Sequence, residues 1–429
     1  MSEIPEIVAP YLPEISAHFA SSGDMDQNNT DQLSEINLTV KSAMVPPHSS
    51  TEERPPEKDD YHSTYLTTSL ESLTRLVKTH SYSLSRPACL PSLLLLCSQH
   101  SHIQDVEVPP WSSAEHQLQA SLLLSKLESI FKPVKTLLAD QDRRLVSQLL
   151  ALLQPSLEKF LSQPAAVYSL TWLTSQLLHP HLGQVVPQLL PHALNWIDCW
   201  IPYYKVFGCH VVGHIINTCP PSELVWFGRA DLLADALGKL LHHADITVTD
   251  ACKEPLINVY KIKHADTKPD KPGPADLLMK DLINCLELTS DNDKKAVYSK
   301  MIQKTVDMLG VGVARWVTRL ASLTVSQLDF SPPDSILSLL TQLCSLCPEC
   351  VGREVPTLLP ALVKFIYRTS YNDKESERTV CDNVGVCLTQ VSSCDPATAR
   401  LLCHNLERVS VNKYFDSVIH RFLKDLALL

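Results

Sequence analysis

Apolar residues recur along most of this chain at the three- and four-residue spacing of a buried helix face, and they come in adjacent pairs of segments. The clearest pair is residues 182–197 and 203–218, separated by a short turn that carries Asp198 and Pro202. The second segment has an apolar stripe formed by Tyr204, Phe207, Gly208, Val211, Val212 and Ile215. A helical hairpin of this kind cannot bury its own apolar face, so it predicts stacked neighbours.

The same spacing predicts further helices. They are expected near residues 123–131, 145–153, 232–241, 248–262, 276–289, 293–309 and 411–428, with another hairpin at 352–393. In that hairpin Asn372, Asp373 and Glu375 supply the turn, and Arg378 lies in the first turn of the second helix. No segment alternates as a strand with hairpin turns would. The pattern therefore predicts an all-α fold, a HEAT-like α-solenoid of stacked helical hairpins with a disordered N-terminal segment.

Five segments follow from this pattern. Residues 1–20 are predicted as a short docking helix, and 21–60 as a disordered segment because they offer too little apolar surface to offset the entropy of ordering. Residues 61–263 form the N-terminal part of the solenoid and 276–429 the C-terminal part. Between them, 264–275 is a polar, Pro-rich loop or hinge.

Composition narrows the class of protein. The 429 residues are too many for one compact core but suit a solenoid, and only 11 are glycine. The net charge of -10 makes nucleic-acid binding by phosphate neutralisation a poor prediction. The chain opens without a secretory signal and has no apolar run of membrane-spanning length, so its 14 cysteines are expected as free thiols in a reducing compartment. We expect a cytoplasmic protein that is also nuclear.

Two clusters suggest metal chemistry, and each has a simpler interpretation. Cys344, Cys347 and Cys350 have the spacing of part of an iron–sulfur or zinc ligand run, but position 354, where a fourth cysteine is needed, is Glu354. We expect these three to be structural thiols. His210 and His214 lie one helical turn apart without the glutamate of the HExxH motif, so they are expected to be packing histidines.

Other catalytic signatures are missing from the sequence. It has no GxxxxGK[ST], GxGxxG or GxSxG motif. We therefore expect no catalytic residue, no cofactor and no bound metal. The residues expected to matter for structure or for partner contact are Asp198, Pro202, Lys205, Gly208, His210, His214, Trp226, Arg229, Arg319 and Phe415. For Trp226, as for the other tryptophans, a place in the core is the more common alternative.

The stretch from Leu182 to Leu241, read with 319–328, resembles the family of the second TELO-two-interacting proteins, which are subunits of the Triple T (TTT) co-chaperone complex. The matching residues are Asp198, Lys205, Gly208, His210, His214, Ile215, Leu224, Arg229 and Leu232. These are packing motifs, so the resemblance transfers no catalytic residue. The N-terminal region has no counterpart.

This resemblance implies an α-solenoid that binds the first TELO-two-interacting protein and, with the TELO-two protein, forms a scaffold. That scaffold would work with the ninety-kilodalton heat-shock chaperone and the RuvB-like ATPase co-chaperone on phosphatidylinositol 3-kinase-related kinases. The implied processes are DNA-damage signalling, growth signalling and telomere maintenance. Two alternatives stay open: another HEAT-repeat adaptor, such as a transport or phosphatase scaffold, and a metal-dependent enzyme.

Overall fold

The structure is a computed structural model of the whole chain. It describes residues 27–47, 54–78, 87–104, 106–140, 144–268, 270–328, 334–370, 375–404, 406, 411 and 413–428. In this part of the chain there are helices and no strand, which confirms the predicted all-α class. The chain divides into two compact units, Met1–Pro220 and Pro221–Leu429, which we call unit 1 and unit 2. The predicted docking helix at 1–20 and the turn residues Asn372 and Asp373 lie outside the described residues.

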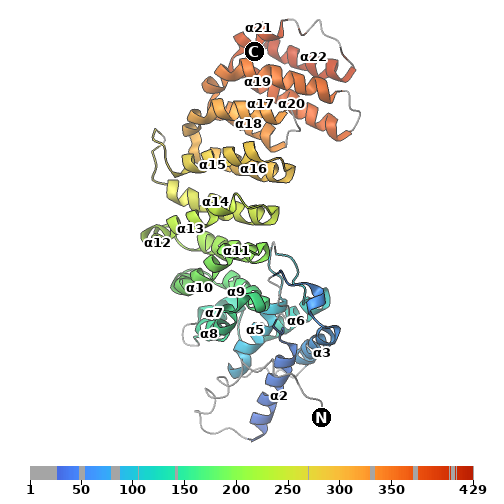
Figure 1. The fold of residues 1–429 in the computed structure, drawn as a ribbon, viewed down its shortest axis with the longest axis vertical. Helices are drawn as coiled ribbons and strands as arrows, with labels where there is room; N and C mark the ends of the chain where they lie inside the picture. The colour runs from blue at the N-terminus through green and yellow to red at the C-terminus, as the bar shows by residue number, and fades with distance from the viewer. Residues whose placement is uncertain are drawn as a thin grey trace. The chain divides into compact units, whose positions relative to one another are not determined.

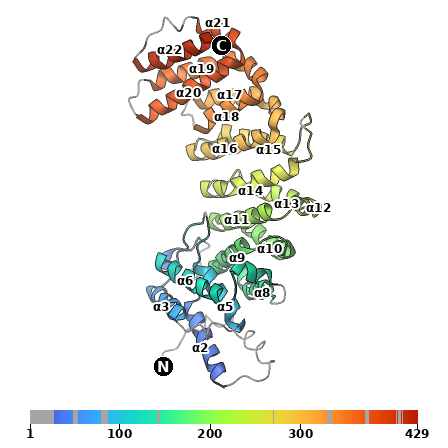
Figure 2. The same cartoon turned by 180° about the vertical axis from the view of Figure 1, so that it is seen from behind.

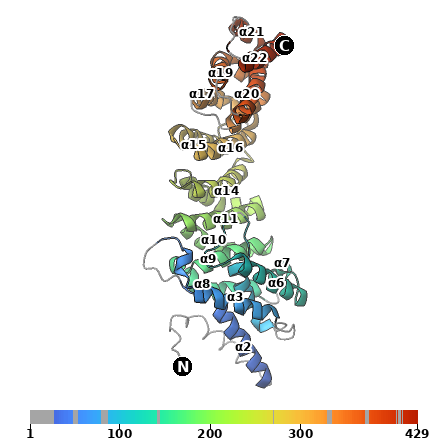
Figure 3. The same cartoon turned by 90° about the vertical axis from the view of Figure 1, so that its right-hand side faces the viewer.

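Unit 1 is a stack of helices (Figures 1 and 3). Its α-helices are α2 (Gln27–Ala43), α3 (Ser63–Lys78), α5 (Leu90–His100), α6 (Ala114–Ile130), α7 (Val134–Ala139), α8 (Leu145–Leu157), α9 (Pro164–Gln176), α10 (His181–Asp198) and α11 (Pro202–Thr218). Three short 3-10 helices accompany them: η2 (Lys58–Asp60), η3 (Pro87–Cys89) and η4 (Phe160–Ser162). Helices α10 and α11 pack as the predicted hairpin, and α11 also packs on α9.

Unit 2 continues the hairpin pattern in two layers, and Figure 2 shows α15 and α16 side by side in it. One layer contains α14 (Ile246–His264), α16 (Asn292–Leu309), α18 (Asp334–Leu346), α20 (Glu375–Cys394) and α22 (Lys413–Leu428), each in contact with the next. The other contains α13 (Arg229–Leu240), α15 (Pro274–Leu288), α17 (Val317–Leu328), α19 (Pro348–Thr369) and α21 (Pro396–Cys403). Helix α12 (Pro221–Trp226) precedes α13, and η5 (Gly310–Trp316) precedes α17. The boundary between the units falls at Pro220–Pro221 rather than at the Pro-rich loop.

The prediction of disorder over 21–60 is wrong for residues 27–43, which form α2. Ile36, Val40 and Ala43 are buried on one face of this helix, which packs on α3 and α5. The backbone N–H of Val45 also donates a 3.1 Å hydrogen bond to Oε1 of Gln99. The apolar residues are too few to stabilise an isolated helix, but they suffice where neighbouring helices cover them.

A charge on the buried face of α2 is therefore expected to destabilise unit 1. Val40→Asp should lower the free energy of unfolding by about 3 kcal/mol, because the carboxylate replaces a buried apolar side chain. Leu38→Asp is the matched control, because Leu38 is 70% exposed on the same helix. Urea unfolding of both variants measures the difference. Equal midpoints for the two would show that α2 is not docked.

Unit 1 also contains two stacked histidine rings, His100 and His116, with ring centroids 5.2 Å apart. Nε2 of His116 lies 2.9 Å from Oγ of Ser69 and 3.1 Å from the carbonyl oxygen of Leu66. Burial, reinforced by the neighbouring His116, lowers the pKa of His100 to about 3. Burial likewise lowers the pKa of His116.

Acid is therefore expected to destabilise unit 1. A histidine whose folded pKa is lowered binds fewer protons in the folded than in the unfolded state, so its contribution is complete above pH 6.5 and falls as the pH drops towards about 3. At one pH unit below the unfolded pKa, His100 alone should lower the free energy of unfolding by about 1.4 kcal/mol relative to neutral pH. Thermal midpoints at two pH values test this: about pH 7.5, and about pH 5.5, which is roughly one unit below the pKa of an unfolded histidine. The variant His100→Asn should show a smaller drop, and an equal drop would contradict the assignment.

Candidate partner-binding surface

Three of the predicted site residues make contacts inside unit 1: Lys205 and Gly208 between α10 and α11, and His214 between α11 and the end of α9. Nζ of Lys205 donates a 2.6 Å hydrogen bond to the carbonyl oxygen of Ile197, near the C-terminal end of α10. Gly208 is buried where α11 meets α10. Nε2 of His214 lies 2.9 Å from the carbonyl oxygen of Leu177, and burial lowers the pKa of this histidine. These contacts are internal to unit 1, so they explain the residue types without a partner.

The remaining predicted residues lie at separate places. In unit 1, Asp198 ends α10 and is exposed, Pro202 begins α11, and His210 is half-buried. In unit 2, Nη2 of Arg319 donates to Oδ1 of Asn284 (2.7 Å) and to Oε2 of Glu287 (3.0 Å), which ties α17 to α15. Phe415 is buried on α22. The structure therefore does not gather the ten residues into one site.

The cysteine run of unit 2 is part of the helix packing. Cys344 and Cys347 are buried and Cys350 is half-buried. A hydrogen bond with Cys394, together with burial, raises the pKa of Cys344, and burial also raises the pKa of Cys347. Among the described residues, no group of three His, Cys, Asp or Glu side chains is placed to hold a metal ion.

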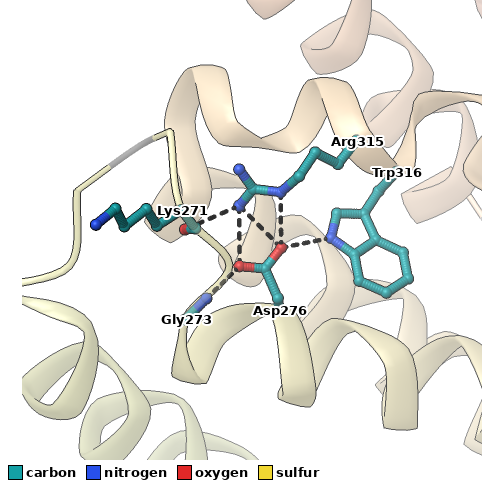
Figure 4. A network of polar contacts seen from close by, with 5 residues as sticks. All are labelled: Lys271, Gly273, Asp276, Arg315 and Trp316. Atoms are coloured by element: carbon teal, nitrogen blue, oxygen red, sulfur yellow. Dashed lines mark hydrogen bonds and ion pairs between the residues drawn. The ribbon is translucent and has the colours of Figure 1, made fainter.

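A polar network that the sequence did not reveal anchors the Pro-rich loop (Figure 4). The carboxylate of Asp276 accepts hydrogen bonds from Arg315 Nη2 (2.9 Å to Oδ2), from Trp316 Nε1 (2.8 Å) and from the backbone N–H of Gly273 (2.8 Å). Arg315 also reaches the carbonyl oxygen of Lys271, at 3.5 Å. Burial alone would raise the pKa of Asp276, but the hydrogen bonds from Trp316, Gly273 and Arg315 outweigh it and lower the pKa.

This network bears on the predicted loop or hinge at 264–275. Its C-terminal end is fixed at both Lys271 and Gly273 to the start of α15 and to η5. The indole N–H of Trp316 is used inside this network. Hinge motion at this loop stays a prediction.

The most unusual exposed feature of unit 2 is a run of apolar side chains at α12 and the start of α13, which Figure 1 shows beside each other. We call it the α12 surface and define it by Val225, Trp226, Phe227, Arg229 and Leu232. The exposed fractions are 56% for Val225, 84% for Trp226, 65% for Phe227 and 48% for Leu232. The guanidinium carbon of Arg229 lies 4.7 Å from the centroid of the Phe227 ring. Large apolar groups exposed close together in sequence make this a candidate interaction surface.

The tryptophans of the chain differ widely in exposure. Trp111 and Trp196 are fully buried, whereas Trp226 is almost fully exposed. Leu224 is the one residue of α12 that is buried, and the helix, which contacts α13 and α14, presents Val225 and Trp226 outward. Of the predicted residues, Trp226 ends α12 and is exposed, and Arg229 begins α13 three residues later, with its guanidinium over the Phe227 ring.

Unit 2 also has a polar groove of about 540 Å³ across α14, α16 and α18. It is lined by Lys253, Glu254, Lys300, Gln303, Lys304, Asp307, Ser338, Thr341 and Gln342. Most of its charge is compensated, since Lys304 pairs with Glu254 and Lys253 Nζ lies 2.6 Å from Asp250. The groove therefore resembles a solvated helix face more than a built ligand site.

Comparison with known proteins defines the class first. No family model matches the chain. Among solved structures, Kap95p in its complex with RanGDP superposes with a TM-score of 0.51 at 13% identity, over 94% of this chain and 48% of that chain. The karyopherin Kap121p gives a TM-score of 0.51 at 14% identity, over 87% and 35%. The chain is thus an α-solenoid of the HEAT-repeat type.

The particular relatives come from sequence. The human TELO2-interacting protein 2 is 25% identical over 240 residues, which cover 53% of this chain and 47% of the relative. The rat protein of that name is 23% identical over 69% of this chain and 62% of the relative, and the mouse protein is 23% identical over 72% and 64%. The match spans about half of the human relative and under two thirds of the rodent ones. These matches confirm the resemblance to the TELO2-interacting protein 2 family.

Within the described residues, no helix combines the length and the apolar character that crossing a membrane requires.

Proposed function

We propose that the protein is a non-catalytic scaffold subunit of a TTT-type co-chaperone complex. Its direct partner would be the first TELO-two-interacting protein, with the TELO-two protein in the same assembly. The observation that carries this proposal is the similarity to three mammalian proteins named TELO2-interacting protein 2. The HEAT-type solenoid supports it, since such folds offer extended surfaces to other proteins.

In this role the protein would support the folding, stability and assembly of phosphatidylinositol 3-kinase-related kinases. It would act indirectly with the ninety-kilodalton heat-shock chaperone and the RuvB-like ATPase co-chaperone, in the cytoplasm and the nucleus. It would bind neither nucleic acid nor membrane. The net charge of -10 favours protein partners over phosphate-rich ones.

Affinity purification of the tagged chain from its own cells tests the proposal. We expect the first TELO-two-interacting protein and the TELO-two protein in stoichiometric amounts, and a fall in kinase protein levels after acute depletion of the chain. Re-expression of the chain should restore those levels. Recovery of transport cargo or a phosphatase instead, with unchanged kinase levels, would favour another HEAT adaptor and contradict the proposal.

A further inference from the structure

We propose that the α12 surface is a protruding anchor that inserts Trp226 into an apolar pocket of a partner protein, and that the rim of this pocket carries a carboxylate that pairs with Arg229. The inference rests on the proposed function for the choice of partner. It goes further in naming the residues that bind and the chemistry of the surface that receives them.

The shape of the surface points to a concave partner. Trp226 is 84% exposed at the end of a six-residue helix, so most of its indole projects beyond its neighbours. Val225 and Phe227 flank it in sequence and are also exposed, and Leu232 adds apolar area from α13. A projecting indole gains most when a pocket covers both of its faces, which is how tryptophan anchors dominate interface energies.

The charge at the surface points to a carboxylate. The guanidinium of Arg229 lies over the Phe227 ring, and no carboxylate among the described residues pairs with it. The nearby Asp231 is instead paired with Lys263, at 2.8 Å. Stacking on the ring restricts the guanidinium and leaves its edge donors available, and this geometry suits a bidentate carboxylate. An apolar pocket with an acidic rim complements this arrangement.

Two other occupants fit less well. A second copy of this chain would have to receive Trp226 in an apolar pocket, and the polar groove of unit 2, which is lined by three lysines, does not offer one. A lipid surface would be opposed by the net charge of -10 and by the exposed Asp231 and Asp235 of α13, the helix that follows the aromatic residues. Helix α12 is also far shorter than the amphipathic helices that lie in membrane interfaces.

The test uses the full purified chain and the purified first TELO-two-interacting protein, with affinity measured by calorimetry. Trp226→Ala is expected to weaken binding at least tenfold, at the scale of an interface hot spot, without changing the thermal midpoint of the free chain. Arg229→Glu should weaken binding about tenfold. Arg229→Lys should weaken it less, because lysine keeps the positive charge but lacks the paired N–H donors of the guanidinium. Leu288→Ala is the control, since Leu288 is 86% exposed elsewhere in unit 2, and it should bind as wild type does.

The outcomes separate a failure of the Trp226 anchor from a failure of the proposed function. Wild-type binding that persists unchanged in Trp226→Ala overturns the anchor and leaves the proposed function standing. If Arg229→Glu binds with wild-type affinity, the partner's pocket has no carboxylate that pairs with Arg229. Absence of wild-type binding contradicts the proposed partner, and the inference falls with it. Self-association in sedimentation, or co-sedimentation with vesicles of phosphatidylcholine and phosphatidylserine, would assign the surface to another occupant if Trp226→Ala abolished it.

Discussion

Replacing Phe415 with aspartate is expected to detach the C-terminal helix and to cost unit 2 about 4 kcal/mol of stability or more. Phe415 is 1% exposed and packs edge-to-face on Tyr367 of α19, with ring centroids 6.1 Å apart. Helix α22 contacts α20 and α21 along the stripe that also contains Val418, Ile419 and Phe422. The stripe is thus covered within unit 2, so the aspartate would place an unpaired charge in the core.

The measurement is thermal unfolding of the isolated chain, followed by circular dichroism, with limited proteolysis to locate the loss. The matched control is Ser417→Asp, which adds the same charge two residues away on the exposed side of α22 and should change stability by less than about 0.5 kcal/mol. Repeats in a solenoid depend on their nearest neighbours, so α20 and α21 should become protease-sensitive first. A Phe415→Asp chain that melts like wild type but fails to bind its partner would make the stripe an interface instead.

The hairpins were predictable because their helices are long and their apolar residues keep a regular spacing. The segments 182–197 and 203–218 correspond to α10 and α11, and 276–289 and 293–309 correspond to α15 and α16. In each case the apolar face must be covered by the next helix, and the spacing of the apolar residues predicts this packing. The fold class therefore follows from local pattern alone.

Helix α2 shows where such reasoning failed. Ile36, Val40 and Ala43 have the spacing of one helix face, but they lie in a polar stretch whose composition is typical of disorder. Their burial depends on α3 and α5, which cover them after folding. The spacing of these three residues predicts a helix, but the average composition of residues 21–60 is polar and led to the prediction of disorder.

The candidate surface could be predicted only in part, because residue type alone does not distinguish a buried tryptophan from an exposed one. Trp196 lies within a long periodic helix and is buried, whereas Trp226 ends a helix too short to have a stripe. That difference in helix length is a signal that favours exposure, but it becomes evident only when the boundary at Gly228 is known. Gly228 has a φ of 65°, the left-handed conformation that glycine tolerates, and it separates α12 from α13. The pairing of Asp276 with Arg315 joins positions far apart in sequence and had no local signal.

Gly208→Val is expected to open the α10–α11 hairpin and to cost unit 1 about 3 kcal/mol. A Cβ at this position would lie 2.7 Å from Cγ1 of Ile197 and 2.8 Å from the carbonyl oxygen of Ala193. The second contact is with backbone, so it can be relieved only by moving the two helices apart. That movement would also stretch the hydrogen bond from Lys205 to the carbonyl oxygen of Ile197.

The comparison of two glycine-to-alanine variants makes this prediction specific. Both Gly208 and Gly238 lie inside helices, so alanine gains up to about 1 kcal/mol of helix propensity at either position. A Cβ on Gly238 meets nothing within 4 Å, so Gly238→Ala should raise the urea midpoint of the full chain. Gly208→Ala should lower it, because the close approach of α10 outweighs the propensity, and Gly208→Val should lower it further. If both alanine variants stabilise the chain, Gly208 does not face α10, and the hairpin contact that the sequence and the structure both indicate is wrong.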